Sequence, residues 1–311
     1  MHEELAQAAR RGIVTTRDAE RRGLSGRDLR RAAETEELVR VRRDAYVASD
    51  VWRSADRVQQ HLVRVEATGR AHPHAVFSHE SAAVVWGLPL VGFPPDAVQV
   101  LGAYGGGGRA YAGAVHRSTT DELDVVVRRG IRVTTCARTV VDLARVRPFV
   151  TGLAAADHAL HARLVTLDGL REAAQAVGRR RGARAARHVV AHATGLAESA
   201  GESLSRARMV ELGVLLPELQ VDLRDDRGVI GRVDFWWPTL ALVGEFDGRV
   251  KYARDGVADP RAPEDRLWDE KLREDRLRAT GARVVRWTWS DAWDPARLLS
   301  ILTTAGVPRV T

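Results

Sequence analysis

The most restrictive feature of the sequence is a short apolar stretch, residues 242 to 247, that carries two carboxylates, Glu245 and Asp247. Side chains two positions apart on a strand share a face, so both acids point to the same side. Two neighbouring carboxylates on an otherwise apolar strand are costly unless something neutralises them. A divalent cation would do so, and the stretch therefore predicts a strand beside a cation site.

The neighbouring elements supply further candidate ligands. Asp234 lies in the stretch "VIGRVDFWW", and a hairpin to the acidic strand would bring it beside Glu245. Glu202 lies on the preceding predicted helix, and Lys251 follows the acidic strand. Oxygen ligands of this kind select Mg²⁺ or Mn²⁺, which can polarise a phosphoryl oxygen and lower the pKa of a bound water. The constellation predicts phosphodiester hydrolysis; the alternative is that these acids are ordinary edge-strand and turn carboxylates.

The C-terminal third has a clear order of predicted elements. "ESAGESLSRARMVELG" is typical of a helix ended by Gly213, and the strands "LQVDL", "VIGRVDFWW" and "LALVGEFDG" follow it. A long helix, "EDRLWDEKLREDRLRATG", ends at Gly281 and leads into the strand "ARVVRWTWSD". The order α-β-β-β-α-β is therefore expected for residues 196–311.

Within this order, "ESLSRARM", "GRVDFWWP", "ALVGEFDGRVKY" and "DEKLREDRLRATGARVVRWTW" resemble the endonuclease-like domain related to Vsr-type mismatch nicking enzymes, in the PD-(D/E)XK superfamily. The resemblance implies a restriction-endonuclease-like fold in which Asp234 is the first metal-binding aspartate. It also implies that Glu245 is the acid of the (D/E)-x-K element, where Asp247 occupies the usual place of the lysine. Lys251 stands where many Vsr-like members have a histidine.

The lysines support this assignment, because only Lys251 and Lys271 are lysines among 48 Lys and Arg residues. A compact, strongly hydrated ammonium beside a metal or scissile phosphate is not readily replaced by arginine. Lys271, on the long predicted helix, is the second candidate for the catalytic charge, although it could simply pair with Asp275. Six of the eight tryptophans lie in the same region, where packing is favoured over stacking on bases.

The first fifty residues predict three short helices followed by a strand pair. Thr15 or Thr16 and then Ser25 are N-cap residues, and Gly12 and Gly23 end the first two helices. This is the plan of a winged helix-turn-helix, in which the third helix enters a major groove and the wing contacts the backbone. The residues predicted to bind DNA are Arg27, Arg30 and Arg31 on the helix and Arg40, Arg42 and Arg43 on the wing. The alternative is a solvated helical cap.

The segment "GIVTTRDAERRGLSGRDLRRAAETEELVRVRRDAYV" resembles the N-terminal winged-helix domain of AbiEi-like antitoxins of type IV toxin–antitoxin systems. The resemblance implies a DNA-binding regulator with a toxin partner. Glu36 and Glu37 stand where a glycine usually opens the wing, and Asp44 replaces another expected glycine. "GLPL", "TTCARTVVDLA" and "ADHAL" resemble the middle of the same proteins.

Residues 51–195 predict a mixed α/β unit with weaker signals. The run Gly105 to Gly108 lacks the spacing of a phosphate-binding loop and is interpreted as a hairpin tip. His72, His74 and His79 lack companions at metal-ligand spacing. Cys136 is expected to be a buried apolar side chain. The arginine run at 178–188 is interpreted either as a phosphate-binding strip or as a solvated helix start.

Composition agrees with these assignments. A chain of 311 residues is long enough for two or three units, and its net charge of +7 and pI near 10.3 favour polyanionic partners. One cysteine and the lack of a long apolar run suit a cytoplasmic location without a membrane anchor. We therefore expect an α/β multidomain protein, with a winged helix at 1–50, a middle α/β unit at 51–195 and the endonuclease-like domain at 196–311.

Three functions follow from these assignments. The leading hypothesis is a DNA-binding, Mg²⁺- or Mn²⁺-dependent endonuclease of defence or repair. The second is an antitoxin-like DNA-binding transcriptional regulator whose nuclease fold is inactive, and the third is a protein-interaction scaffold. The target site and the oligomeric state are left open by the sequence.

Overall fold

The computed structural model describes residues 3–103, 114–119, 125–248 and 263–310. The chain forms two compact units, residues 1–147 with 168–187 and residues 148–167 with 188–311. Helices combine with three antiparallel or mixed sheets in the described ranges, which confirms the predicted α/β multidomain class. The three-domain limits expected from the sequence stay a prediction.

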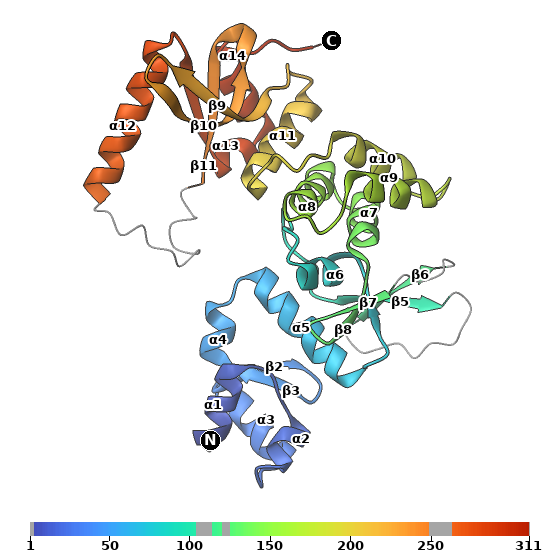
Figure 1. The fold of residues 1–311 in the computed structure, drawn as a ribbon. Coiled ribbons are helices and arrows are strands. Elements are labelled where there is room, and N and C mark those ends of the chain that lie inside the picture. The colour runs from blue at the N-terminus through green and yellow to red at the C-terminus, as the bar shows by residue number, and fades with distance from the viewer. Residues whose placement is uncertain (1–2, 104–113, 120–124, 249–262, 311) are drawn as a thin grey trace. The chain divides into compact units, whose positions relative to one another are not determined.

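The first unit opens with three helices and a small antiparallel sheet of order β1-β3-β2 (Figure 1). These elements are α1 (Glu3–Arg11), β1 (Val14–Thr15), α2 (Thr16–Glu20), α3 (Gly26–Glu34), β2 (Leu38–Arg42) and β3 (Ala45–Ala48). Thr15 and Ser25 cap α2 and α3, each exchanging hydrogen bonds with an aspartate three residues later. Leu5, Leu29 and Leu38 are buried between the helices and the sheet. The winged-helix plan is therefore observed.

The wing keeps a backbone that suits glycine, although the residues there are acidic. Glu36 has a φ of 56° and Asp44 a φ of 67°, both in the left-handed region. Asparagine and aspartate tolerate this region better than glutamate does, because a short polar side chain can bond locally. The chain therefore makes the turns expected of glycine at a cost in conformational strain.

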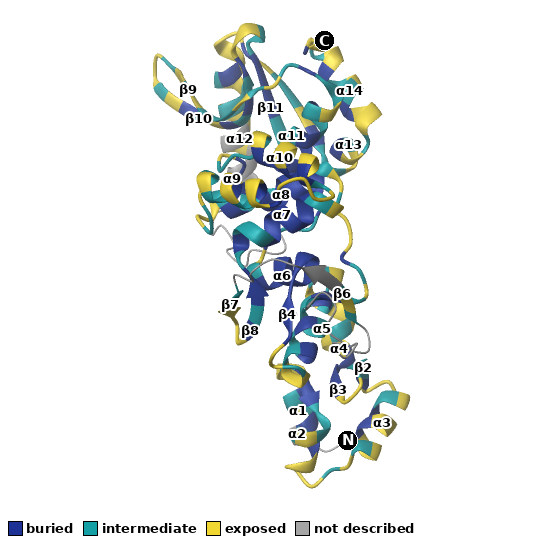
Figure 2. Ribbon diagram, turned by 90° about the vertical axis from the view of Figure 1, so that its right-hand side faces the viewer, coloured by how far each residue is buried: buried dark blue, intermediate teal, exposed yellow. Residues whose placement is uncertain are grey.

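The rest of the first unit is built around a five-stranded mixed sheet of order β6-β5-β4-β8-β7. Its elements are α4 (Ser49–Ser54), α5 (Arg57–Ala71), β4 (Val76–Phe77), α6 (His79–Trp86), β5 (Val98–Ala103), β6 (Ala114–Thr119), β7 (Val125–Arg128), β8 (Ile131–Thr134), α7 (Cys136–Val146) and α9 (Leu167–Ala176). The helix α10 (Ala183–His192) crosses the division between the units. Figure 2 shows α6 and α7 as mostly buried helices.

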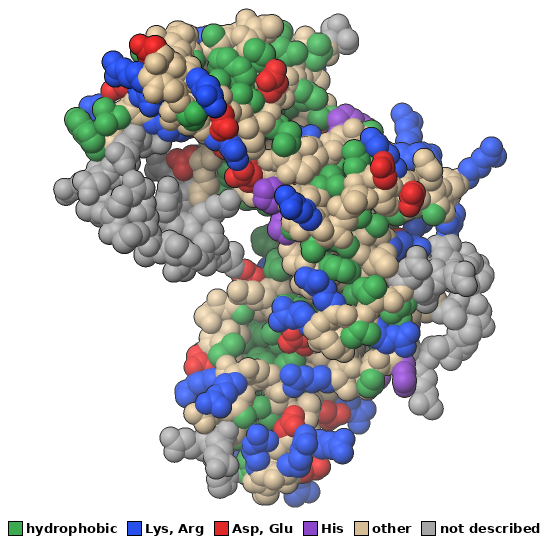
Figure 3. Space-filling view, viewed as in Figure 1, with side chains coloured by type: hydrophobic (Ala, Val, Ile, Leu, Met, Phe, Trp, Pro, Cys, Tyr) green, Lys and Arg blue, Asp and Glu red, His purple; other side chains and the backbone are tan. Residues whose placement is uncertain are grey.

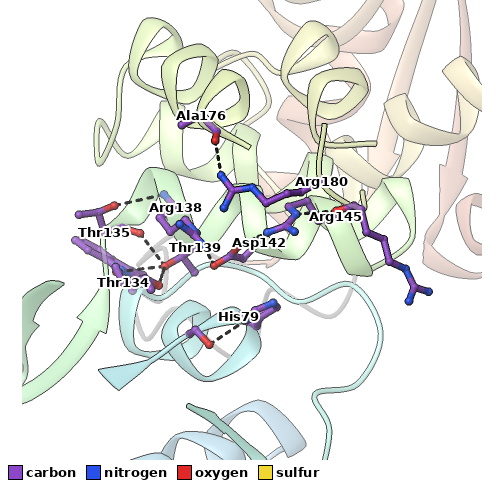
Figure 4. A network of polar contacts seen from close by, with 12 residues as sticks. His79, Thr134, Thr135, Arg138, Thr139, Asp142, Arg145, Ala176 and Arg180 are labelled. Carbon is purple, nitrogen blue, oxygen red and sulfur yellow. Dashed lines mark hydrogen bonds and ion pairs between the residues drawn. The ribbon is translucent and has the colours of Figure 1, made fainter. Parts of the chain in front are cut away.

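The buried carboxylate of Asp142 in α7 is paired with two arginines (Figure 4). Asp142 accepts a hydrogen bond from Arg138 Nε at 2.9 Å and another from Arg145 Nη1 at 3.2 Å. Burial raises the pKa of Cys136 to about 11, so its thiol is protonated and the structural interpretation stands. Arg180 donates to the carbonyls of Ala176 and Val177 at the end of α9, so this arginine of the 178–188 run stabilises a helix terminus. Gly105 to Gly108 lie outside the described residues.

The second unit contains the predicted order α-β-β-β-α-β. Its elements are α8 (Phe149–His161), α11 (Ala200–Leu212), β9 (Glu218–Asp225), β10 (Gly228–Trp237), a 3₁₀ turn (Pro238–Leu240), β11 (Leu242–Asp247), α12 (Pro263–Ala279), β12 (Arg283–Thr288), α13 (Trp289–Trp293) and α14 (Pro295–Thr304). The sheet order is β12-β11-β10-β9, with β11 parallel to β12 and the other pairs antiparallel. Gly213, with φ of 61°, ends α11 as expected.

Two glycines let α11 and the aromatic core approach β11 closely. A Cβ atom on Gly244 would lie 2.6 Å from the Trp287 ring and 2.9 Å from the Trp237 ring, and one on Gly201 would lie 2.0 Å from the Phe246 ring. Trp237 and Trp287 are fully buried, while Trp268 is 60% exposed. Side chains therefore leave no free space between α11 and this part of the sheet.

A buried aspartate holds α11 in place. Asp157 of α8 accepts hydrogen bonds from Thr194 N at 2.8 Å, Ser203 Oγ at 2.9 Å and Arg206 Nη1 at 2.6 Å. Because Ser203 and Arg206 belong to α11, the contacts fix this helix, which also carries Glu202. Among the described residues, none of the helices combines the length and the apolar character needed to cross a bilayer.

Candidate functional site

Strand register places four polar residues in one row across the sheet of the second unit. Glu245 of β11 pairs with Arg286 of β12. The antiparallel register Phe235↔Gly244 makes Asp234 the next neighbour of Glu245, as the sequence predicted. Gln220 of β9 faces Asp234 between the pairs Val221↔Val233 and Leu219↔Phe235.

Asp234 enters the gap where β10 and β11 separate. Its Oδ2 atom accepts a hydrogen bond from the backbone N–H of Phe246 at 2.9 Å, beyond the last ladder pair of the two strands. The carboxylate therefore accepts a hydrogen bond of the kind that a strand carbonyl would otherwise accept. Its negative charge lies between β10 and β11, where the two strands separate. Its Oδ1 atom accepts from Gln220 Nε2 at 3.3 Å.

These residues line a cavity of about 580 Å³ at the end of β11. The lining is Ser199, Glu202, Arg232, Asp234, Glu245, Phe246, Asp247, Gly248, Arg273 and Arg286. The structure thus brings together all four predicted acids. Four carboxylates and three guanidinium groups leave the lining with one uncompensated negative charge when every acid is ionised.

The pKa of Asp234 is raised by its burial and by the neighbouring acids. Burial is the main cause that raises its pKa to about 6, and the negative charges of Glu202 and Glu245 add to the effect. The hydrogen bond from Phe246 opposes the shift. A carboxylate with such a pKa is poorly neutralised by its surroundings and would be stabilised by a cation.

Glu202 has a structural role as well as a place in the cavity. Its carboxylate accepts hydrogen bonds from Ser199 Oγ at 2.6 Å and Glu198 N at 2.9 Å at the start of α11. Gln220 Nε2 also donates to Glu202 Oε2 at 2.9 Å and so joins Glu202 to Asp234. Gln220 has a φ of 53°, a left-handed conformation within a strand that costs roughly 1–3 kcal/mol.

Glu245 is held by two arginines. Arg273 of α12 contacts one carboxylate oxygen, and Arg286 Nε donates to the other at 3.1 Å. Within the described parts of the chain, no three His, Cys, Asp or Glu residues stand together in an arrangement that could hold a metal ion. The acids share a cavity, but the oxygens of Glu202, Asp234 and Glu245 already accept hydrogen bonds. The donors are arginines, the Gln220 amide and groups at the start of α11.

The two candidate lysines fall elsewhere. Lys251 lies outside the described residues. Lys271 is exposed on α12, with its ammonium 5.7 Å from the centre of the Trp268 ring, and it does not line the cavity. Arg273, two positions along, reaches Glu245 instead, because two residues turn an α-helix through about 200°.

Sequence reasoning missed Gln220, Arg273 and Arg286. The parallel pairing of the strand "ARVVRWTW" with the acidic strand would have located Arg286, once the register was known. Gln220 could have been found from its position two residues before Asp222 in "LQVDL", on the strand that pairs with Asp234. Arg273 depends on the rotation of α12, for which the sequence has no comparable signal.

The first unit carries the second candidate site, on its winged helix. Leu29 and Ala32 of α3 are buried, while Arg27, Arg30 and Arg31 are exposed on the opposite side of the helix. Figure 3 shows Lys and Arg side chains gathered over the N-terminal elements on the face in view, together with some acids. These three arginines are therefore open to solvent, as the winged-helix prediction requires.

The wing arginines differ from one another. Arg40 and Arg43 are exposed. Arg42 is partly buried, and its Nη2 atom lies 2.7 Å from His72 Nε2. A bulge between Arg40 and Arg42 changes the alternation of the strand, which accounts for this inward direction. The DNA contacts of all six arginines stay a prediction.

Comparisons with known proteins bear on the winged helix and on residues 98–191, which include parts of both units. Residues 3–48 match the family described as "Transcriptional regulator, AbiEi antitoxin", and residues 98–191 match the "AbiEi antitoxin C-terminal domain". The match confirms the expected likeness of the N-terminal segment and of "TTCARTVVDLA" and "ADHAL", while "GLPL" lies before the second matched range. The likeness to Vsr-type enzymes stays a prediction.

Two curated relatives are uncharacterized proteins of Mycobacterium tuberculosis, MT2308 from strain CDC 1551 and Rv2248 from strain H37Rv. Each is 37% identical over 118 residues, which cover 38% of this chain and 44% of the relative. The crystal structure of the RV2827C protein from M. tuberculosis aligns with a TM-score of 0.40 and 13% identity, over 71% of this chain and 87% of that one. The chain thus has two segments that match AbiEi antitoxin families, and its match covers less than half the length of its curated relatives.

Proposed function

We propose that the protein is a DNA-binding transcriptional regulator of the AbiEi antitoxin type that acts with a toxin partner. The match of residues 3–48 to that family, on a folded winged helix, is the observation that carries the proposal. The exposed Arg27, Arg30 and Arg31 on α3 are suited to a DNA groove. Arg40 and Arg43 can contact phosphates beside it.

The test uses the full chain and duplex DNA. Fluorescence anisotropy across a range of salt should show an affinity that falls steeply with ionic strength, because each neutralised phosphate releases counterions. Replacing Arg40 and Arg43 with glutamine should reduce the logarithmic salt slope by about two units. Affinity that does not depend on salt would contradict the proposal. Rescue of growth when the chain is co-expressed with its cognate toxin tests the antitoxin role separately.

A second candidate function is metal-dependent cleavage of DNA at the carboxylate cavity. Its specific support is the raised pKa of Asp234 in a cavity with an excess of acid. Hard oxygen donors of this kind suit Mg²⁺ or Mn²⁺. The residues that would hold the ion are Asp234, Glu245 and Asp247, with Glu202 beside them. The oxygen donors are of the type that a divalent cation takes, although the described acids are not grouped to hold one in this structure.

When bound, such an ion would polarise a phosphoryl oxygen and acidify a water. The chain's own residues would bind and orient: Arg232 and Arg286 line the same cavity and can hold a phosphate oxygen, while Gln220 holds Asp234 and Glu202 together. Lys251 and Lys271 remain the proposed sources of a catalytic ammonium. Arg273 and Arg286 would have to share or release Glu245 for the ion to bind.

Calorimetry and plasmid nicking test this candidate. Mn²⁺ should raise the melting temperature of the wild type, since a ligand at a hundred times its Kd stabilises the folded state by about 2.7 kcal/mol. Asp234→Asn should abolish both the shift and any nicking. An equal Mn²⁺ shift in the two proteins would place the metal elsewhere, and a folded wild type without either response would leave the cavity without this function.

A further inference from the structure

A small basic cavity lies between the wing and α5 in the first unit. Its volume is about 300 Å³, and its lining is Val41, Arg42, Arg43, Arg64, Thr68, Asp96 and Val98. Three guanidinium groups face one carboxylate, so the lining carries two uncompensated positive charges. The cavity at the end of β11 has the opposite balance, and the ligand expected here is an anion.

The walls of this cavity are held together by apolar packing. Val63 and Ala67 of α5 pack with Val39 and Val41 of β2 in one cluster that includes Val47 of β3. Arg70 of α5 also donates a hydrogen bond to the carbonyl of Ile13 at 2.8 Å. The wing and α5 are therefore packed rigidly against each other, which fixes the positions of Arg42 and Arg43 relative to Arg64.

Arg42 lines the cavity, and contacts at both terminal nitrogens hold its guanidinium group. Its Nη2 lies 2.7 Å from His72 Nε2 and its Nη1 donates to the carbonyl of Arg43 at 3.2 Å. Burial and the charge of Arg42 lower the pKa of His72, which leaves that ring neutral and able to accept. The buried Nε atom of Arg42 finds no acceptor among the described residues. Because this atom is almost wholly inaccessible to solvent, a bound anion is expected to contact the terminal nitrogens of Arg42 instead.

The carboxylate in the lining compensates little of the charge. The Asp96 side chain is 85% exposed, and its Oδ1 atom is 3.9 Å from Arg64 Nη2, too far for a hydrogen bond. Arg64 is instead oriented by the Trp52 ring, whose centre lies 4.9 Å from its guanidinium carbon. Arg43 is exposed at the rim. Guanidinium groups directed in this way are suited to a multivalent oxyanion.

We propose that the cavity between the wing and α5 binds a phosphate group through Arg42, Arg43 and Arg64. The phosphate belongs either to a DNA backbone or to a free phosphate compound. The first source rests on the proposed DNA-binding function and extends the DNA contact from the winged helix to α5. The second source does not depend on DNA binding.

Two substitutions with opposite expected effects test the site in the full chain. Calorimetry in inorganic phosphate, against chloride at equal ionic strength, should show a rise in melting temperature for the wild type. Arg64→Gln should weaken phosphate binding about tenfold, because it removes a charge-assisted hydrogen bond. Asp96→Asn should strengthen binding, because it removes the carboxylate that opposes the anion. Arg171→Gln, at an exposed pair with Asp168, is the charge-matched control.

The salt dependence of DNA binding identifies the source. A phosphate response together with a salt slope about one unit smaller in Arg64→Gln assigns the site to the DNA backbone. A phosphate response with an unchanged slope, or in a chain that binds no DNA, assigns it to a free phosphate compound. If neither Arg64→Gln nor Asp96→Asn differs from the control in either measurement, the site is rejected, whether or not the winged helix binds DNA.

Discussion

The winged helix and the carboxylate cavity use arginine in opposite ways. On α3, Arg27, Arg30 and Arg31 project into solvent from the side opposite the buried Leu29. In the second unit, Arg273 and Arg286 both pair with Glu245, and Arg286 also pairs with Glu274. The same residue type therefore makes an open cationic surface in one place and neutralises an acid in the other. A net charge of +7 does not distinguish these uses.

The difference separates two kinds of recognition. A surface of solvated arginines attracts a polyanion over a distance of about 10 Å at moderate salt and needs no cofactor. A cavity with more carboxylates than guanidinium groups repels a phosphate unless a cation enters first. The proposed DNA contact of the first unit therefore needs no cofactor, whereas the proposed cleavage in the second unit depends on a cation.

The largest expected effect concerns the open surface. Replacing Arg27, Arg30 and Arg31 with glutamine should weaken duplex DNA binding on the order of several hundredfold near 0.1 M salt, with a salt slope about 2.7 units smaller. Anisotropy titrations measure both. The matched control replaces three exposed arginines of the second unit, Arg278, Arg297 and Arg309. Equal losses in the two triple variants would show that charge, irrespective of place, governs binding.

The next effect concerns Asp234 and pH. Its pKa rises from 3.8 unfolded to about 6 folded, so the folded protein binds the proton more tightly. The tighter proton binding stabilises the folded state fully below about pH 4, and this stabilisation is lost as the pH rises through 6. The loss is about 3 kcal/mol at most. In metal-free buffer, Asp234→Asn should therefore be more stable than the wild type at pH 7.5 and similar near pH 4. Urea unfolding across this range decides it, and lower stability of the variant at pH 7.5 would refute the electrostatic argument.

A smaller effect compares two ion pairs. Glu245→Gln should destabilise the protein by about 1–2 kcal/mol, because the partly buried Arg273 and the exposed Arg286 lose a charged acceptor. Glu36→Gln, which weakens the exposed pair with Arg53, should change stability by less than about 0.5 kcal/mol. Denaturant unfolding of both variants at pH 7.5 checks the ranking. Similar losses would mean that Glu245 is no better shielded from water than Glu36.

The smallest effect concerns the wing backbone. Glu36→Gly should stabilise the protein by about 0.5–1 kcal/mol, because the relief of left-handed strain exceeds the added freedom of the unfolded chain. Asp44→Gly should gain less, since aspartate tolerates this conformation. Thermal unfolding measures both, with DNA affinity as the check that the wing is intact. Destabilisation by Glu36→Gly would show that its side chain contributes more than its backbone costs.

Local signals in the sequence predicted much of the fold. Ser25 as an N-cap and Gly213 as a helix end are decided by bonds within a few residues, so the sequence contains the relevant information. The pairing of Asp234 with Glu245 was also predictable, because a short connection fixes the hairpin register.

The rest of the site depends on distant packing. Lys271 and Arg273 lie on one helix, and only the rotation of α12 against the sheet decides that Arg273 reaches Glu245. The inward turn of Arg42 depends on a bulge and on His72, thirty residues away. The left-handed conformation of Gln220 has no sequence signal at all, since glutamine rarely adopts it. Side chains whose direction is set by another element are therefore the ones that sequence reasoning misplaced or missed.

The close packing at Gly201 and Gly244 has a consequence for how such a domain changes over generations. Any side chain at either glycine would collide with the Phe246, Trp237 or Trp287 rings, so the fold does not tolerate substitution at these positions. An amide in place of Asp234 is expected to leave the fold intact and even strengthen it. Selection on folding alone would therefore preserve the two glycines while it let the acids disappear. If related chains retain the acids of the cavity as well as the glycines, selection has acted on the function of the cavity and not on folding alone.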